Sequence, residues 1–188
     1  MSDYTGAMNL TRSMKDFVLH WGEMGTRWGV NRTVAQVHAL LYLSPEPLDA
    51  EEIAETLSVA RSNVSTSLRE LQNWNLVHLV PRMGERRDRF HTSHDLWELF
   101  LTVVEQRVER EIAPTIVMLR RCAEEARKDK ATDAVVTNSI AAMSEFLGEL
   151  HEWYGQMKKL PAATLRSLMR VGTGLTKWLP TARRGGAR

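Results

Sequence analysis

The stretch from Arg61 to Arg69 combines short hydrogen-bonding side chains with two arginines. Its polar members are Arg61, Ser62, Asn63, Ser65, Thr66 and Arg69. Hydroxyl and amide groups of this kind can read base edges in a DNA major groove about 12 Å wide, and arginines can hold guanines or phosphates. Polar residues on an exposed helix face are most often only solvated, so this pattern needs a second signal beside it.

A second basic group follows in the stretch RMGERRDR. Its arginines are Arg82, Arg86, Arg87 and Arg89. Arginines at the tip of a hairpin can reach a neighbouring minor groove or its phosphates. The two groups in this order favour a DNA-binding surface over a merely solvated one.

Two helices and a tight turn are predicted to position the first group. Asp49 with Glu52 three residues later is a capping-box pattern, so a helix should begin there. A turn over 58–60 and a second helix over about 61–73 should follow. Ala60 offers no capping side chain to that second helix, which is either a small loss of stability or moves the cap to Ser62. The residues expected to face inward are Ile53, Ala54, Leu57, Val64, Leu68 and Leu71.

A short hairpin is predicted to position the second group. Val77, Leu79 and Pro81 alternate with His78 and Val80, which predicts a short strand. Gly84 lies within the charged stretch, and a second strand should run from Phe90 to Thr92. These two strands would form a β-wing whose tip carries the arginines.

Helices are predicted on both sides of this block. From Asp95 the pattern is helical as far as Ile112, and Pro114 should kink or split the helix. Two apolar stripes have spacings of three and four residues. The first contains Leu10, Met14, Phe17, Trp21, Met24 and Trp28, and the second contains Val136, Ile140, Met143, Leu147, Leu150, Tyr154 and Met157. Either a symmetric homodimer buries these stripes or the helices pack only within their own subunit.

Composition and charge exclude several classes of protein. The 188 residues carry 25 Lys+Arg and 23 Asp+Glu, but residues 58–91 hold six arginines against Glu70, Glu85 and Asp88. No P-loop, dinucleotide turn, nucleophile elbow or metal-ligand cluster is present, so we expect no enzyme, no cofactor and no metal. The single cysteine, the lack of a signal peptide and the lack of a membrane-length apolar run predict a cytoplasmic protein without a membrane partner.

The chain resembles the MarR-type winged-helix transcription regulators, and among them the GbsR branch. The resemblance rests on three segments, LSPEPLDAEEIAETLSVARSNVSTSLRELQNWNLV, GERRDRF and HDLWELFLTVVEQRVEREIAPTI. The sequence departs from the family pattern at Ser58, Ala60 and Glu85. The resemblance implies a homodimer that binds double-stranded DNA, acting as a repressor on a pseudo-palindromic operator. The alternative is a winged-helix protein-interaction or architectural module that recognises no specific sequence.

We therefore expect a mainly α protein: a winged helix-turn-helix domain with a two-stranded β-wing, flanked by N- and C-terminal helices that form a dimerisation lobe. The expected segments are 1–30 for the N-terminal helix of the lobe, 31–94 for the DNA-binding domain, 95–180 for the helical dimerisation and effector lobe, and 181–188 for a basic flexible tail.

Three weaker signals have competing interpretations. Trp21, Trp28, Trp97 and Trp153 lie on helices of the expected lobe, where they are either core residues or a cage for a small-molecule effector. The family association with choline and glycine betaine suggests a quaternary ammonium ligand. Cys122 is either a redox thiol or a small core residue. His91 and His94 are too sparse for a metal site.

Overall fold

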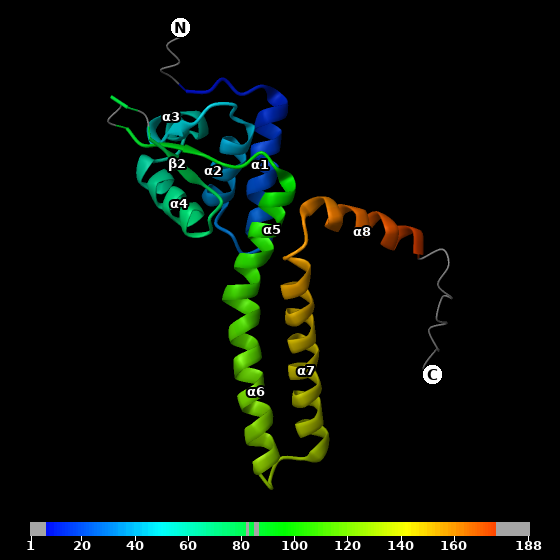
Figure 1. Cartoon of the computed structure of the whole chain (residues 1–188). Helices are drawn as coiled ribbons and strands as arrows, with labels where there is room; N and C mark the ends of the chain where they lie inside the picture. Colours follow the sequence, from blue (N-terminus) through cyan, green and yellow to red (C-terminus); the bar gives the residue numbers. More distant parts are fainter. Residues whose placement is uncertain (1–6, 82, 85–86, 176–188) are drawn as a thin grey trace, which may run out of the picture. The chain divides into compact units, whose positions relative to one another are not determined.

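The structure, a computed structural model, describes residues 7–81, 83–84 and 87–175 (Figure 1). The predicted tail over 181–188, as well as Arg82 and Arg86, lies outside the described residues. The elements in order are α1 (Arg12–Arg27), α2 (Arg32–Leu43), β1 (Leu48–Asp49), α3 (Ala50–Leu57), α4 (Arg61–Asn73), β2 (His78–Val80), β3 (Arg89–His91), α5 (Leu96–Arg107), η1 (Val108–Ile112), α6 (Ala113–Lys128), α7 (Ala134–Met157) and α8 (Ala162–Leu175). The mainly helical winged-helix fold is as predicted.

The chain divides into two compact units, one ending at Gln106 and the other beginning at Arg107. The first unit, called here the reading unit, contains α1 to α5 and the sheet. The second, called here the hairpin unit, contains η1 and α6 to α8. The predicted segments 1–30 and 95–180 assigned α1 and α5 to a dimerisation lobe. This division groups both helices with the helix-turn-helix in one compact unit, and the dimerisation lobe stays a prediction.

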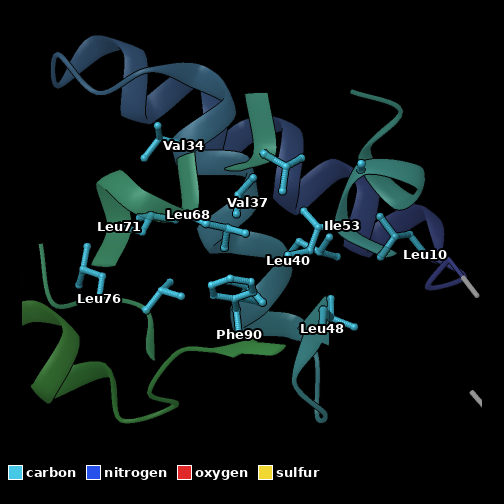
Figure 2. Packing of buried hydrophobic residues seen from close by; sticks show 14 residues of the cluster. Leu10, Val34, Val37, Leu40, Leu48, Ile53, Leu68, Leu71, Leu76 and Phe90 are labelled. Atoms are coloured by element: carbon cyan, nitrogen blue, oxygen red, sulfur yellow. The ribbon is translucent and has the colours of Figure 1, made fainter. Parts of the chain in front are cut away.

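The reading unit has a single apolar core built from α2, α3, α4 and the sheet (Figure 2). Val37, Leu40 and Ile53 are completely buried in it. The inward positions predicted on α4 are also buried. The members of this core are Leu10, Val34, Val37, Leu40, Leu41, Leu48, Ile53, Ala54, Val64, Leu68, Leu71, Leu76, Val77 and Phe90.

Helix α1 packs closely against α2 through its glycines. Val18, Gly22 and Gly25 are the buried positions of α1. A Cβ atom built on Gly25 would lie 2.6 Å from the Cβ of Ala35, so only glycine allows this approach. The predicted apolar stripe lies beside this contact: Phe17 and Trp21 remain half-buried and Trp28 is exposed. At the start of the stripe, Leu10 is buried in the core and Met14 packs against it, so in the single chain only Trp28 of the stripe is exposed.

The helix-turn-helix forms as its local signals predict. Asp49 accepts hydrogen bonds from the N–H groups of Glu51 and Glu52, while Glu52 accepts one from the N–H of Asp49, which completes the capping box. Ser58 then adopts a left-handed conformation, with φ 54°, and ends α3. Helix α4 begins at Arg61 with Ala60 as N-cap and no capping side chain, so the alternative cap at Ser62 is not used.

The sheet contains one strand more than the predicted two-stranded wing. Its order is β1-β3-β2, and both pairings are antiparallel. In β1, Leu48 lies opposite Phe90 and Asp49 opposite Arg89. A two-residue strand is too short to produce an alternating pattern, so it left no sequence signal. Its consequence is that the wing strand β3 is tied directly to the start of α3.

A buried polar chain links α2 to the base of the wing. The hydroxyl of Thr92 donates to the carbonyl of Leu76 at 2.7 Å, and Nε2 of His38 lies 3.2 Å from the same hydroxyl oxygen. Because the hydroxyl proton is committed to Leu76, His38 must supply the proton of the second bond. Burial lowers the pKa of His38 to about 4, so the imidazole is neutral at pH 7.

In the hairpin unit, α6 and α7 lie side by side (Figure 1). Ile116 and Ala123 of α6 and Ser144 of α7 are buried. The helix predicted around the stripe over 136–157 is confirmed, yet its apolar residues stay half-buried or exposed in the single chain. The predicted interruption at Pro114 is also present, because η1 is a π-helical turn immediately before α6, where proline removes a hydrogen-bond donor.

The described residues contain neither a membrane-spanning helix nor a cluster of metal-ligating side chains. No described helix is long and apolar enough to cross a membrane. No group of three or more His, Cys, Asp or Glu side chains among those residues could hold a metal ion.

Candidate nucleic-acid interface

A groove of about 420 Å³ lies between α4, the first turn of α3 and the wing. Helix α4 contributes Arg61, Ser65, Arg69 and Gln72, whose spacing of four, four and three residues places them on one face. Leu68 of α4 also lines the groove. The lining residues from outside α4 are Asp49, Ala50, Glu51, Arg87, Asp88 and Phe90. The structure thus brings residues from both predicted basic groups to one concave surface.

The predicted residues of α4 divide into two sets. Arg61, Ser65 and Arg69 line the groove. The remaining three, Ser62, Asn63 and Thr66, are exposed but do not line it. The hydroxyl of Thr66 donates to the carbonyl of Ser62 at 3.1 Å, so its proton is already used within the helix. Asn63 therefore offers the richest hydrogen-bonding group of this second set, with an amide that both donates and accepts.

Arg61 forms an ion pair with an acidic residue of α3. Its guanidinium lies 3.4 Å from a carboxylate oxygen of Glu51, and the two side chains are 66% and 43% exposed. Glu51 itself is fixed at its backbone, because its N–H donates to Asp49 at 2.8 Å. The pair is open to solvent, so its contribution to stability is small.

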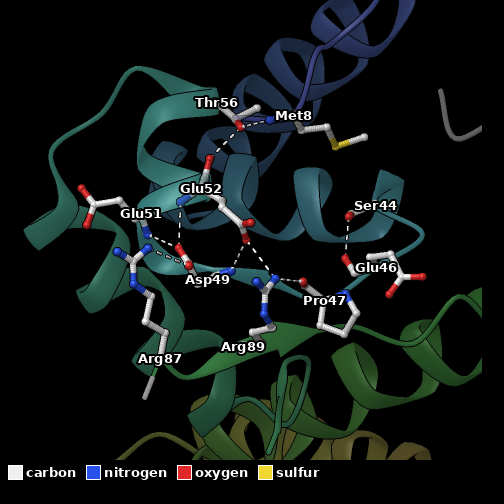
Figure 3. Close-up of polar contacts among 10 residues, drawn as sticks. All are labelled: Met8, Ser44, Glu46, Pro47, Asp49, Glu51, Glu52, Thr56, Arg87 and Arg89. Atoms are coloured by element: carbon white, nitrogen blue, oxygen red, sulfur yellow. Dashed lines mark hydrogen bonds and ion pairs between the residues drawn. The ribbon is translucent and has the colours of Figure 1, made fainter. Parts of the chain in front are cut away.

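Arg87 of the wing is held by the cap of α3 (Figure 3). Its guanidinium donates to Asp49 at 3.1 Å. Burial alone raises the pKa of Asp49, but the N–H of Glu52, the Arg87 guanidinium and the N–H of Glu51 outweigh burial and lower this pKa below its usual value. The same contact raises the pKa of Arg87. Asp49 therefore serves at once as helix cap and as anchor of the wing.

Arg89 lies deeper than Arg87, the other described arginine of the wing. Its side chain is 15% exposed, and it donates to Glu52 at 3.2 Å and to the carbonyl of Pro47 at 2.9 Å (Figure 3). Glu52 is in turn bonded to the N–H of Asp49. These contacts attach β3 to the start of α3. The contact of Arg89 with DNA stays a prediction.

Several groove residues were absent from the sequence prediction. Gln72 continues the Arg61, Ser65 and Arg69 row by one turn, so extending that helical spacing could have found it. Asp49 was recognised only as a capping residue, and Glu51 was not assigned to the site. Their approach to the arginines depends on the folding of α3 against α4 and β3, which no local spacing encodes.

The four tryptophans predicted for an effector pocket each have a different local environment. Trp21 stacks on Phe17 with ring centroids 5.5 Å apart, and Trp97 lies tilted against Phe100 at the same separation. Trp28 and Trp153 are exposed. Trp153 belongs to the hairpin unit and the others to the reading unit. The aromatic cage stays a prediction.

The two minor candidates have ordinary surroundings. The thiol of Cys122 lies half-buried, 3.5 Å from the sulfur of Met118 one turn earlier on α6. His91 pairs with His78 across the sheet, with ring centroids 5.7 Å apart, while His94 stacks on Tyr42. His91 and His94 thus have separate aromatic partners. The redox role of Cys122 stays a prediction.

Comparison with known proteins shows that the chain is similar to transcriptional regulators. Residues 28–88 match the model of the MarR family. The HTH-type transcriptional repressor OpcR of Bacillus subtilis (strain 168) is 21% identical over 126 residues, which are 67% of this chain and 68% of OpcR. The repressor GbsR of the same organism is 21% identical over 136 residues, covering 71% and 75% of the two chains. A crystal structure of a transcriptional regulator shares the fold, with a TM-score of 0.63, 17% identity and coverage of 77% and 95%.

Proposed function

We propose that this chain, which belongs to the MarR family of winged helix-turn-helix transcriptional regulators, represses transcription by binding a specific operator as a homodimer. The family consists of regulators and not of enzymes. DNA binding is implied at the level of the family. The operator sequence preference, the dimer, the repression and the effector are our proposals. We also propose that the protein acts in the cytoplasm, as expected from its sequence.

The observation that carries the proposal is the groove shared by α4 and the wing. It offers Arg61, Arg69 and Arg87 for phosphates or guanines, and Asn63 lies exposed on the same helix. Helix α4 presents polar groups rather than the exposed aromatic residues that favour a protein partner. In the proposal, α4 enters the major groove and the wing reaches the adjacent backbone.

The decisive experiment is selection of bound duplexes from a random pool. A recovered pseudo-palindrome supports an operator read by two equivalent helices about 34–36 Å apart. Recovery of no preferred sequence, with equal affinity for every duplex, instead supports an architectural role. Absence of DNA binding supports a protein-interaction module.

One asparagine variant and one arginine variant distinguish contacts to DNA bases from contacts to DNA phosphates. Asn63→Ala should cost about 1–3 kcal/mol of binding free energy at one operator position only. Arg87→Ala should weaken binding evenly across sequences and lower the slope of affinity against salt by about 1. An even loss in both variants would contradict the assignment of Asn63 to base reading.

The proposed homodimer follows from apolar surface that the single chain leaves exposed. On α7, the stripe residues Val136, Met143 and Leu150 are 49%, 57% and 45% exposed. Large apolar patches of this kind mark association surfaces. We assign a second copy as the occupant, because the stripe has the heptad spacing of self-associating helices and pseudo-palindromic DNA requires a two-fold partner.

The dimer is tested by placing a charge in the stripe. Leu150→Glu should convert the protein to monomers in sedimentation, whereas Asn138→Glu, which adds the same charge at an exposed polar position of α7, should not. A wild-type protein that sediments as a monomer and protects a single half-site would overturn the dimer.

The proposed effector is a small cation held by aromatic faces. Its support is the resemblance together with the four tryptophans named above. Titration of tryptophan fluorescence with choline and glycine betaine tests it. A lack of response at millimolar ligand concentrations would remove this part of the proposal.

A further inference from the structure

The ion pair between Arg61 and Glu51 lies inside the groove where the proposed function places DNA. Both residues line this groove, together with Arg87 and Asp88 of the wing. Arg61 is the first residue of α4, and Glu51 belongs to the first turn of α3. A negative charge at this place is opposite to what binding of phosphates by itself requires.

The two residues differ in backbone support and in exposure. Glu51 has its backbone N–H bonded to Asp49, which is buried and bonded to two consecutive N–H groups. The side chain of Arg61 is the more exposed of the two, and its guanidinium lies 3.4 Å from the carboxylate of Glu51. An arginine without such a partner samples many rotamers, which costs entropy when it must hold one base.

We infer that Glu51 is a specificity-determining residue that positions Arg61 for one base contact and disfavours its use on phosphates. This inference rests on the proposed function. The carboxylate limits the orientations of the guanidinium, and its charge repels backbone phosphates that approach without a matching base. Glu51 contacts no DNA in this scheme and acts through Arg61.

Two further arginines, both in the wing, are paired with carboxylates at the start of α3. Arg87 is paired with Asp49, and Arg89 with Glu52. Asp49 and Glu52 form the capping box, so their replacement would disturb α3 itself. Glu51 is not part of the capping box. Among the three carboxylates of these described pairs, Glu51 is therefore the one whose charge can be removed with little effect on the fold.

The test compares Glu51→Gln with Glu55→Gln. Glu55 is exposed on the same helix, lies outside the groove lining, and its replacement makes the same change in net charge. Affinities are measured by fluorescence anisotropy for the duplex recovered by selection and for a random duplex, over a range of salt concentrations. Thermal melting checks that both variants are folded.

For Glu51→Gln we expect random duplex to bind about twofold to fivefold tighter at low salt, which is the effect of one exposed ion pair. Binding of the selected duplex should change less, so the ratio of the two affinities falls. Repeated selection should show a weaker preference at the base pair whose preference is lost in Arg61→Ala. Adding Glu51→Gln to Arg61→Ala should have no further effect on that base pair.

Three outcomes have distinct meanings. If Glu51→Gln and Glu55→Gln raise both affinities by one common factor, only net charge matters and the role of Glu51 is overturned. If Glu51→Gln leaves the affinity ratio and base preference unchanged, the role is also overturned while the proposed function stands. If the wild-type protein binds all duplexes equally, the proposed function fails, and the inference fails with it.

Discussion

The two compact units use their apolar residues in opposite ways. In the reading unit, leucines and valines of α2 and α4 are completely buried within one chain. In the hairpin unit, the described buried residues are Ile116, Ala123, Ser144 and Leu165, and large side chains such as Phe146 and Trp153 are exposed. Two packed helices cover only one face of each other, so the remaining apolar faces of the hairpin unit are exposed in the single chain. The contrast separates a region with an apolar core of its own from one that leaves large apolar side chains exposed.

Polar groups follow the same division. The reading unit buries His38, Asp49 and Glu52 in hydrogen-bonded positions that fix the wing. The described ion pairs of the hairpin unit, Arg107 with Glu111 and Arg121 with Glu125, are exposed pairs one helical turn apart. Such surface pairs contribute little to stability. Charge therefore has a positioning role in the reading unit and mainly a solvating one in the hairpin unit.

The largest expected difference concerns equal truncations in the two units. Leu40→Ala should lower the free energy of unfolding by about 2–5 kcal/mol, because it creates a cavity in the core. Leu150→Ala, measured in dilute monomer, should change it by less than about 0.5 kcal/mol, because that side chain is half exposed. Urea unfolding measures both values, and similar losses would remove the distinction between the units.

A pH titration should reveal the buried histidine of the reading unit. The pKa of His38 is lowered to about 4, so the unfolded chain takes up a proton below about pH 6.5 while the native chain does not. The free energy of unfolding should fall by on the order of 3 kcal/mol between pH 6.5 and 4. His38→Gln should reduce this slope, whereas His151→Gln, at an exposed position of α7, should leave it unchanged. An unaltered slope in His38→Gln would contradict the assignment.

Glycine replacements should have opposite signs in the two units. Gly25→Ala should destabilise the reading unit by about 1–3 kcal/mol, because the new Cβ would lie 2.6 Å from that of Ala35. Gly155→Ala should stabilise α7 by about 0.5–1 kcal/mol, because no heavy atom lies within 4 Å of the new Cβ. Thermal unfolding of the two variants measures the signs, and destabilisation by both would show that α7 is covered at Gly155.

Removal of helix caps should give the smallest effects. Asp49→Ala and Asp133→Ala should each cost about 0.5–2 kcal/mol, with Asp49 at the upper end because it also holds Arg87. The lowered pKa of Asp49 means that its contribution is present above its unfolded pKa and disappears as pH falls through the folded pKa. Acid unfolding below about pH 4 should therefore be less steep in Asp49→Ala. Equal behaviour of the two variants would contradict the anchoring role of Asp49.

Local signals predicted the helix-turn-helix closely. The capping box at Asp49, the turn at Ser58 and the start of α4 at Arg61 all depend on a few neighbouring residues. The apolar spacing of α4 also identified its buried face, because helical periodicity determines which residues share a side. The interruption at Pro114 followed from the missing N–H of proline.

Other features depended on contacts between distant segments. The strand β1 exists because Leu48 meets Phe90, and two residues alone have no readable period. The close packing of α1 used Gly22 and Gly25 in addition to Val18, while the larger residues of the predicted stripe lie beside that contact. Patterns of apolar residues identify which faces are hydrophobic, but they do not tell which partner covers each face.

The sequence by itself determined the winged-helix fold, the helix boundaries around the turn and the two groups of arginines, because these depend on caps, periodicity and residue type. Only the tertiary structure decided which arginines meet a carboxylate. Arg61, Arg87 and Arg89 are paired with Glu51, Asp49 and Glu52, respectively. Ion pairing requires side chains to come within a few ångströms, and for these residues that approach is created by the packing of α3 against α4 and β3.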